Sequence, residues 1–154
     1  MLQTEVWVLL SGAEEVGCQG MKDFLQSHRA ELEGAAFINF EAVGVGETQY
    51  TSREGMTFPY ASSLRLMDLA ATITSRHPDW HSQPRVLGAG YTETGLVLQK
   101  GYEGITLIGL DDAGFLPYWH QIDDVLDNLE PDALNRAARM GWEMLQEIDR
   151  TRKQ

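Results

Sequence analysis

An apolar run that ends in two adjacent carboxylates constrains the fold of this chain more than any other feature. Residues 6–10 are Val, Trp, Val, Leu and Leu, and a turn with Glu14 and Glu15 between Gly12 and Gly17 follows. Strand-forming residues before a glycine-bounded turn predict a β-strand. In open α/β folds, ligands bind beyond the carboxyl ends of the strands. Because burying two neighbouring carboxylates is costly, we expect Glu14 and Glu15 to belong to an active site.

The same pattern occurs again within the first third of the chain. Residues 35–40 predict a buried strand that leads into Glu41, with Gly44 and Gly46 just after it. Between the two strands, residues 21–32 carry apolar side chains at helical spacing. A strand, a helix and a second strand with short connections form a βαβ unit, which implies a parallel sheet.

The rest of the chain continues this alternation. We expect a short strand at 48–52, a helix at 62–76, a short helix at 95–100 capped by 92–94, a buried strand at 105–110 and a final helix from Pro131. The sequence therefore predicts one domain over residues 1–154 with an α/β fold. Its expected architecture is a three-layer α/β/α arrangement with a mainly parallel sheet between helices.

Composition excludes several classes of partner. The formal net charge is -11, which repels nucleic acid and anionic membranes, so neither is expected as a partner. No apolar run reaches the length of a membrane span, and residues 1–5 do not form a signal peptide. Cys18 is the single cysteine, which rules out an intrachain disulfide and leaves the compartment open.

Three strand ends deliver the candidate chemistry. Glu14 and Glu15 follow the first predicted strand, Glu41 follows the second, and His120 comes after a loop beyond the strand at 105–110. Parallel strands bring their carboxyl ends to one edge of a sheet, so these side chains can converge. Carboxylate and imidazole ligands suit zinc, and a free carboxylate beside zinc can take a proton from bound water.

Several segments resemble the zinc exopeptidases of metallopeptidase family 28. Residues 11–17 are similar to the acidic-pair turn of that family, and residues 38–44 are similar to its next ligand strand. Residues 120–129 resemble its last ligand segment, and residues 92–94 resemble the loop before that segment. The segments follow the family's order over essentially the whole chain. The resemblance implies an aminopeptidase-type exopeptidase that hydrolyses a terminal bond of a peptide or aminoacyl substrate with two zinc ions.

The resemblance also implies a role for each matching residue. Glu14 would be the general base, Glu15 and His120 would share one zinc, and Glu41 would bind the companion zinc. The residues expected near the substrate pocket are Thr92, Glu93 and Tyr118.

The family also uses an upstream histidine and a metal-bridging aspartate, for which this sequence has no counterpart. The metal ligand set is therefore incomplete, because a tight zinc site normally takes three protein ligands. We expect a carboxy-terminal portion of a catalytic domain, truncated at the amino-terminal edge of its sheet, with little or no activity. An exposed sheet edge would favour a homo-oligomer.

Two other functions remain open at this point. The first is a related amide chemistry on the same scaffold, the zinc-dependent cyclisation of amino-terminal glutamine. The second is a non-catalytic module that retains the scaffold and binds a partner. For single residues, Glu14 and Glu15 can also be an exposed acidic turn, and His120 can be a packed histidine between aromatic residues.

Overall fold

The computed structural model describes residues 2–55, 57–88 and 90–151. The strands are β1 (Ala36–Glu41), β2 (Glu47–Glu54), β3 (Tyr60–Ala61), β4 (Pro84–Leu87) and β5 (Glu103–Leu110). The α-helices are α1 (Gln19–Ser27), α2 (Leu64–Arg76), α3 (Glu93–Gln99) and α4 (Pro131–Thr151), and short 3-10 helices span Pro78–Trp80 and Leu126–Asn128. The predicted α/β class is confirmed.

The sheet is mixed, so the prediction of a mainly parallel sheet is only partly right. β5 lies between β1, to which it is parallel, and β2, to which it is antiparallel. β2 is also antiparallel to β3 and parallel to β4. The reason is the connection after β1: residues 42–46 are far fewer than the roughly dozen residues that a parallel crossover requires.

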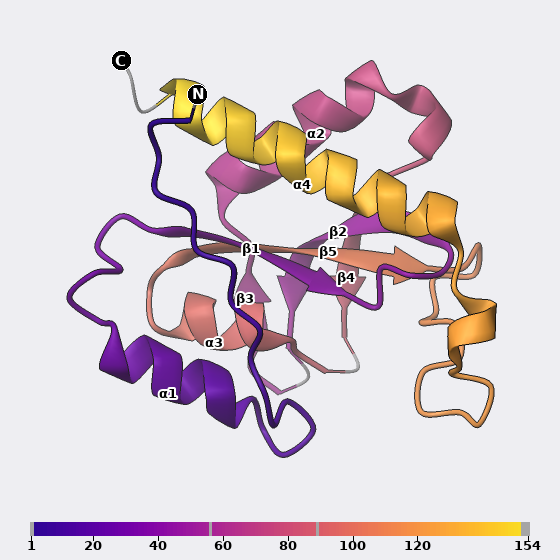
Figure 1. Ribbon diagram of the computed structural model, residues 1–154, viewed down its shortest axis with the longest axis horizontal. Helices are drawn as coiled ribbons and strands as arrows, with labels where there is room; N and C mark the ends of the chain where they lie inside the picture. The colour runs from indigo at the N-terminus through magenta and orange to yellow at the C-terminus, as the bar shows by residue number, and fades with distance from the viewer. Residues whose placement is uncertain (1, 56, 89, 152–154) are drawn as a thin grey trace.

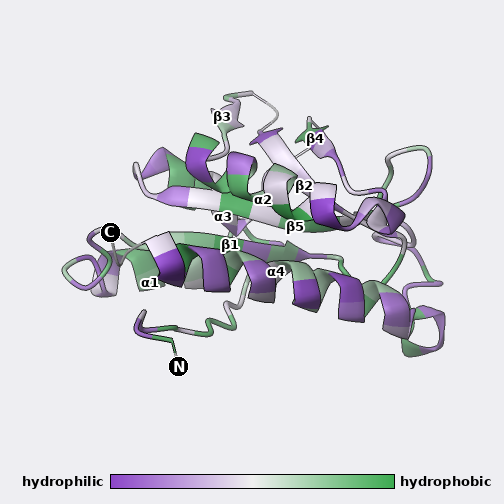
Figure 2. Cartoon of the chain, turned by 90° about the horizontal axis from the view of Figure 1, so that it is seen from above, coloured by the Kyte–Doolittle hydropathy of each residue, from purple (hydrophilic) through white to green (hydrophobic). Residues whose placement is uncertain are grey.

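Helices cover both faces of the sheet, as the three-layer prediction requires. Figure 1 shows α2 and α4 on one face and α1 and α3 on the other. The core between the sheet and helices α2 and α4 includes Leu66, Ile73, Ile105, Leu107 and Met140. In Figure 2, α4 alternates between hydrophilic and hydrophobic residues, as expected for a helix with one buried face. No helix in the described ranges combines the length and apolar character that crossing a membrane would take.

The predicted strand at residues 6–10 is wrong. This segment pairs with no strand in the described structure, and Val8 and Leu10 are 86% and 92% exposed. Figure 1 shows it running from the end of α4 to the turn before α1. Trp7 instead packs edge-on against Phe24 and His28, with ring centroids 6.0 and 5.4 Å away. Apolar β-formers make a strand only where a neighbouring strand completes their backbone hydrogen bonds.

Short-range signals in the sequence locate the helices well. Thr92 is the N-cap of α3, and its side-chain oxygen accepts a hydrogen bond from the Thr94 N–H. Pro131 is the first residue of α4, where its missing N–H leaves no hydrogen bond unmade. The helix predicted over residues 21–32 is shorter than expected, since α1 ends at Ser27.

A close backbone contact fixes the loop that follows Glu41. A Cβ atom added to Gly109 of β5 would lie 2.3 Å from the carbonyl oxygen of Ala42 and 2.4 Å from that of Val45. Only glycine lets β5 and residues 42–46 approach this closely. The position of Glu41 at the end of β1 therefore depends on the absence of a side chain at residue 109.

We expect Gly109→Ala to lower the free energy of unfolding by about 1–3 kcal/mol, because the added methyl group meets rigid backbone. Urea denaturation followed by circular dichroism measures this change. Gly88→Ala is the matched control, since a Cβ at Gly88 meets no atom within 4 Å. The control should stay within about 0.5 kcal/mol of wild type. An unchanged stability for Gly109→Ala would show that this contact does not hold the loop.

Candidate active site

The turn that carries Glu14 and Glu15 is held by its own backbone. The Glu14 carbonyl oxygen accepts hydrogen bonds from the N–H groups of Gly17 and Cys18, both at 2.8 Å. The Gly20 N–H donates to the Gly12 carbonyl oxygen at 3.0 Å, and a Cβ on Gly20 would lie 2.7 Å from that oxygen. The glycines that flank the acidic pair thus allow the chain to close on itself before α1.

The structure brings together Glu15 and His120, the two residues predicted to share a metal. His120 Nε2 lies 3.0 Å from Glu15 Oε1, across 105 residues of sequence. Their side chains are 54% and 69% exposed, so packing does not hold them in place. Exposed ion pairs add little to stability. This contact therefore places two possible ligands side by side without being a structural requirement of the fold.

Glu41 lies within the electrostatic reach of the same turn. Burial raises its pKa to about 7, and the negative charges of Glu93, Glu14, Glu54 and Glu15 add to the shift. The pKa of Glu14 is also raised, first by burial and then by the charges of Glu15 and Glu93. Glutamates from four different segments therefore converge, and their mutual repulsion favours either a proton or a cation among them.

A buried carboxylate near these groups, Glu54, was not predicted from the sequence. Glu54 is fully buried, and its oxygens accept hydrogen bonds from the Thr92 N–H at 2.7 Å and the Thr92 hydroxyl at 2.8 Å. The hydroxyl of Thr106 donates to it at 3.0 Å. This network fixes the start of α3 and with it Glu93, which accepts a hydrogen bond from the Ser11 hydroxyl at 2.7 Å. Glu54 lies beyond the strand predicted at 48–52, in a polar stretch that gives no sign of burial, and the structure makes it the last residue of β2.

Strained backbone is concentrated in the segments that carry the candidate residues. Six non-glycine residues in the described chain have positive φ, and all but one lie in these segments: Ala13, Cys18, Ala42, Tyr118 and His120, with His81 as the exception. Such conformations cost of order 1–3 kcal/mol each and persist where the surrounding structure imposes them. Tyr118 has φ 58° two residues before His120, so the predicted pocket residue helps to shape the loop.

The donor chemistry fits zinc, but the donor count is low. Glu15 and His120 offer a carboxylate and an imidazole at one point, while Glu41 faces the cluster from the end of β1. Across the described ranges, no three His, Cys, Asp or Glu side chains are grouped closely enough to hold a metal ion. The residues present therefore fit one zinc ion held by two protein ligands, which is fewer than a tight site requires.

The raised pKa of Glu41 predicts a pH-dependent stability. Between its ordinary pKa of 4.5 and its folded pKa of about 7, the folded chain binds more protons than the unfolded chain. The contribution of Glu41 to stability is therefore complete below pH 4.5 and is lost as the pH rises through 7. We expect Glu41→Gln, measured without metal, to raise Tm at pH 8 by about 3 °C, the shift for about 1 kcal/mol in a domain of this size.

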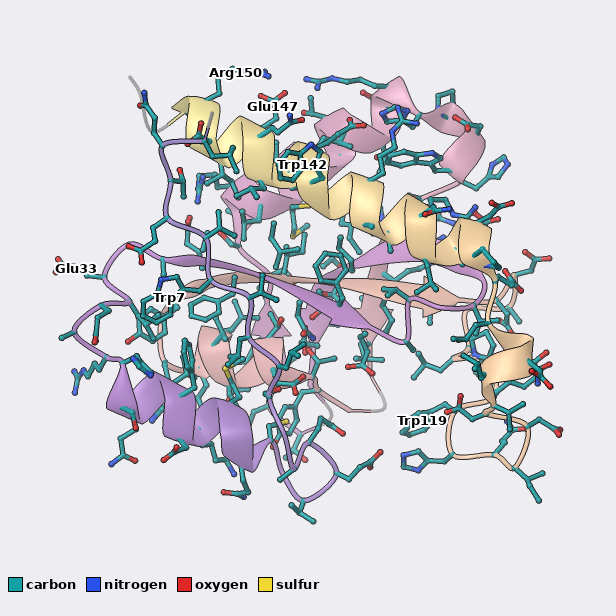
Figure 3. The ribbon with its side chains drawn as sticks, viewed as in Figure 1. Trp7, Glu33, Trp119, Trp142, Glu147 and Arg150 are labelled. Atoms are coloured by element: carbon teal, nitrogen blue, oxygen red, sulfur yellow. The ribbon has the colours of Figure 1, made fainter. Side chains whose placement is uncertain are left out.

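The Tm difference between Glu41→Gln and wild type should shrink toward zero as the pH approaches 4.5. Glu33→Gln is the control, because Glu33 is exposed on the loop before β1 (Figure 3) and loses the same charge. A Glu41→Gln curve that runs parallel to wild type from pH 4.5 to 8 would contradict the shifted pKa.

Comparison with solved structures identifies the fold. Two structures of LapA from Legionella pneumophila, one described as an aminopeptidase, align with TM-scores of 0.67 and 0.65 and identities of 14% and 13%. Both alignments cover 90% of this chain, but this chain spans only 38% and 39% of the LapA chains. At these identities the similarity establishes the fold alone. None of the curated proteins compared with the chain matches it.

The family is established by a separate comparison. A family model described as peptidase family M28 matches residues 1–145 of the 154-residue chain. The match includes the acidic-pair turn, the strand that ends in Glu41 and the segment around His120. The chain therefore belongs to peptidase family M28, whose members are generally metal-dependent peptidases.

Proposed function

We propose that this chain carries the carboxylate and histidine part of the active site of an aminopeptidase-type exopeptidase. The substrate would be a peptide or an aminoacyl compound, cleaved at its terminal peptide bond. Membership of peptidase family M28 and the fold similarity to the LapA aminopeptidase support this function. Because the chain spans 38% of LapA, we propose that it represents a portion of the catalytic domain with weak activity.

The observation that carries the proposal is the 3.0 Å contact between Glu15 and His120. These residues come from the turn before α1 and the loop after β5, and neither is buried. Core packing does not explain why two exposed side chains so far apart in sequence meet beside Glu14 and Glu41. Their contact therefore supports a functional site. A packed histidine is not the role of His120, since half of its side chain is exposed.

Each residue has a distinct role in this proposal. Glu14 moves a proton, and the raised pKa that burial and the neighbouring glutamates give it makes it a stronger base than an ordinary carboxylate. Glu15 and His120 would hold one zinc ion, and Glu41 is the single ligand that this chain offers to a companion zinc. When bound, zinc supplies charge stabilisation at the reacting carbonyl oxygen. Thr92 and Glu93 hold the start of α3 in place beside the site. Thr92 does so through its hydrogen bond to Glu54, and Glu93 through its hydrogen bond from Ser11.

Zinc binding measured by calorimetry tests the ligand assignment. We expect one weakly bound zinc ion in wild type, because two protein ligands hold it less tightly than three. Glu15→Gln and His120→Ala should each abolish this binding. His81→Ala is the control, since His81 is an exposed histidine outside the site and its loss should leave binding unchanged. Zinc binding that survives both site substitutions would contradict the assignment.

Hydrolysis of leucine 4-nitroanilide at saturating zinc tests the role of Glu14. We expect slow turnover in wild type and a loss of about 100-fold or more in Glu14→Gln, the usual contribution of a proton-transferring group. Turnover that is unaffected by Glu14→Gln would refute this role. Tight binding of two zinc ions with rapid turnover would refute the conclusion that the metal ligand set is incomplete.

A further inference from the structure

A cavity of about 350 Å³ lies against the loop that carries His120. Its walls come from strands β2, β4 and β5 and from five residues of the loop after β5: Gly114, Phe115, Leu116, Trp119 and Gln121. Most of the lining is apolar and includes Leu87, Ile108, Leu110, Phe115, Leu116 and Trp119. A mostly apolar cavity with few polar groups is the usual form of a small-molecule site, in which the polar groups fix the orientation of the ligand.

Two of the lining residues connect this cavity to the candidate active site. Trp119 precedes His120, and their rings lie 4.3 Å apart. Figure 3 shows Trp119 projecting from its loop toward the body of the domain. Ile108 is the register partner of Glu41 across the pairing of β1 with β5. The cavity therefore adjoins the strand end that carries Glu41 and the loop that carries His120.

Arg85 is the one cationic residue among those that line the cavity in the described chain. Arg85 lies on β4 and is paired with Thr51 of β2. The hydroxyl of Ser52, also on β2, donates a hydrogen bond to the backbone carbonyl of Arg85. Its Nε is buried and has no hydrogen-bond partner within the described residues. An arginine in a chain with a net charge of -11 would ordinarily find a carboxylate, yet no ion pair involves Arg85 in residues 2–55, 57–88 and 90–151.

We propose that this cavity binds a carboxylate-bearing group of the substrate and that Arg85 receives the carboxylate. The apolar walls take the aliphatic or aromatic part of the group, and the guanidinium takes its charged end. A guanidinium remains charged at any physiological pH and pairs with carboxylates through parallel hydrogen bonds. Apolar surroundings strengthen such a pair, because little water competes for it. This inference names a substrate class for the candidate active site, and it therefore rests on the proposed function.

The glutamates of the active site explain why the cation is needed. Glu14, Glu15, Glu41 and Glu93 would repel an anionic substrate that approached them without a compensating charge. Arg85 supplies that charge from β4, which forms part of the cavity wall. The carboxylate can belong to an acidic side chain or to the free carboxyl end of a short peptide.

Binding of small probes to the metal-free chain tests this proposal without requiring turnover. The probes are 4-methylpentanoate and its neutral isostere 4-methylpentanamide, titrated in the presence of a chelator and followed by NMR at the Trp119 indole N–H. We expect the carboxylate to bind at least about 10-fold more tightly than the amide, as expected for a charge-assisted hydrogen bond. Arg85→Gln should remove this difference, and Arg85→Lys should restore part of it.

Arg53→Gln is the matched control. Arg53 is exposed on β2, next to β4, and its loss changes the net charge equally, so the preference for the carboxylate should survive. Equal binding of both probes to wild type would overturn the proposal and leave a purely apolar pocket. Absence of binding, or a carboxylate preference retained in a folded Arg85→Gln variant, would overturn it as well.

Two further probes identify the source of the carboxylate. N-acetylglutamate α-amide carries only the side-chain carboxylate, and N-acetylleucine carries only the terminal one. Tighter binding of the first supports an acidic residue in the pocket, and tighter binding of the second supports recognition of a peptide end. Neither readout depends on zinc, so failure of the zinc and hydrolysis experiments would not affect this result. Likewise, an empty cavity would leave the roles of Glu15 and His120 standing.

Discussion

The register between β1 and β5 is the constraint on which the rest of the structure depends. β5 is buried along almost its whole length, with Ile105 and Leu107 in the core under α2 and α4. Because side chains alternate along a strand, a slip of one residue would move every one of them to the opposite face. The observed register pairs Glu41 with Ile108, which places the carboxylate away from that core and near Glu93. Because Gly109 has no side chain, residues 42–46 can pack closely against β5.

The site shows two ways to keep a carboxylate away from bulk water. Glu54 is fully buried, and hydroxyl and backbone N–H groups satisfy its oxygens, so its burial is compensated by hydrogen bonds. Glu41 is only partly buried but faces other glutamates, and its pKa is raised to about 7. The first arrangement makes a rigid base for α3. The arrangement around Glu41 leaves a carboxylate whose negative charge is favoured only when a proton or a cation neutralises it. Such groups are typical of functional sites rather than of hydrophobic cores.

Local signals were enough to predict most elements but could not give their arrangement. The buried strand that became β5, the capping role of Thr92 and the start of α4 at Pro131 all follow from short-range chemistry. Residues 6–10 have the composition of a strand, but a strand also requires a neighbour, which no local pattern reveals. The direction of β2 depends on a connection length. At the site, Glu15 and His120 were predicted together, whereas Glu54 and Arg85 lie outside the strands predicted from the sequence, where no local pattern indicated a role for them.

The loss of the first predicted strand does not remove the geometry that it was expected to support. The acidic turn is closed by the bond from Gly20 to Gly12 and by the two bonds to the Glu14 carbonyl oxygen. Cys18 at the end of the turn is buried with Met21 and Leu25 of α1, so the turn is anchored on its helical side. The position of Glu15 therefore depends on α1 and the glycines rather than on residues 6–10. That is why its contact with His120 forms here, although the segment before it is not part of the sheet.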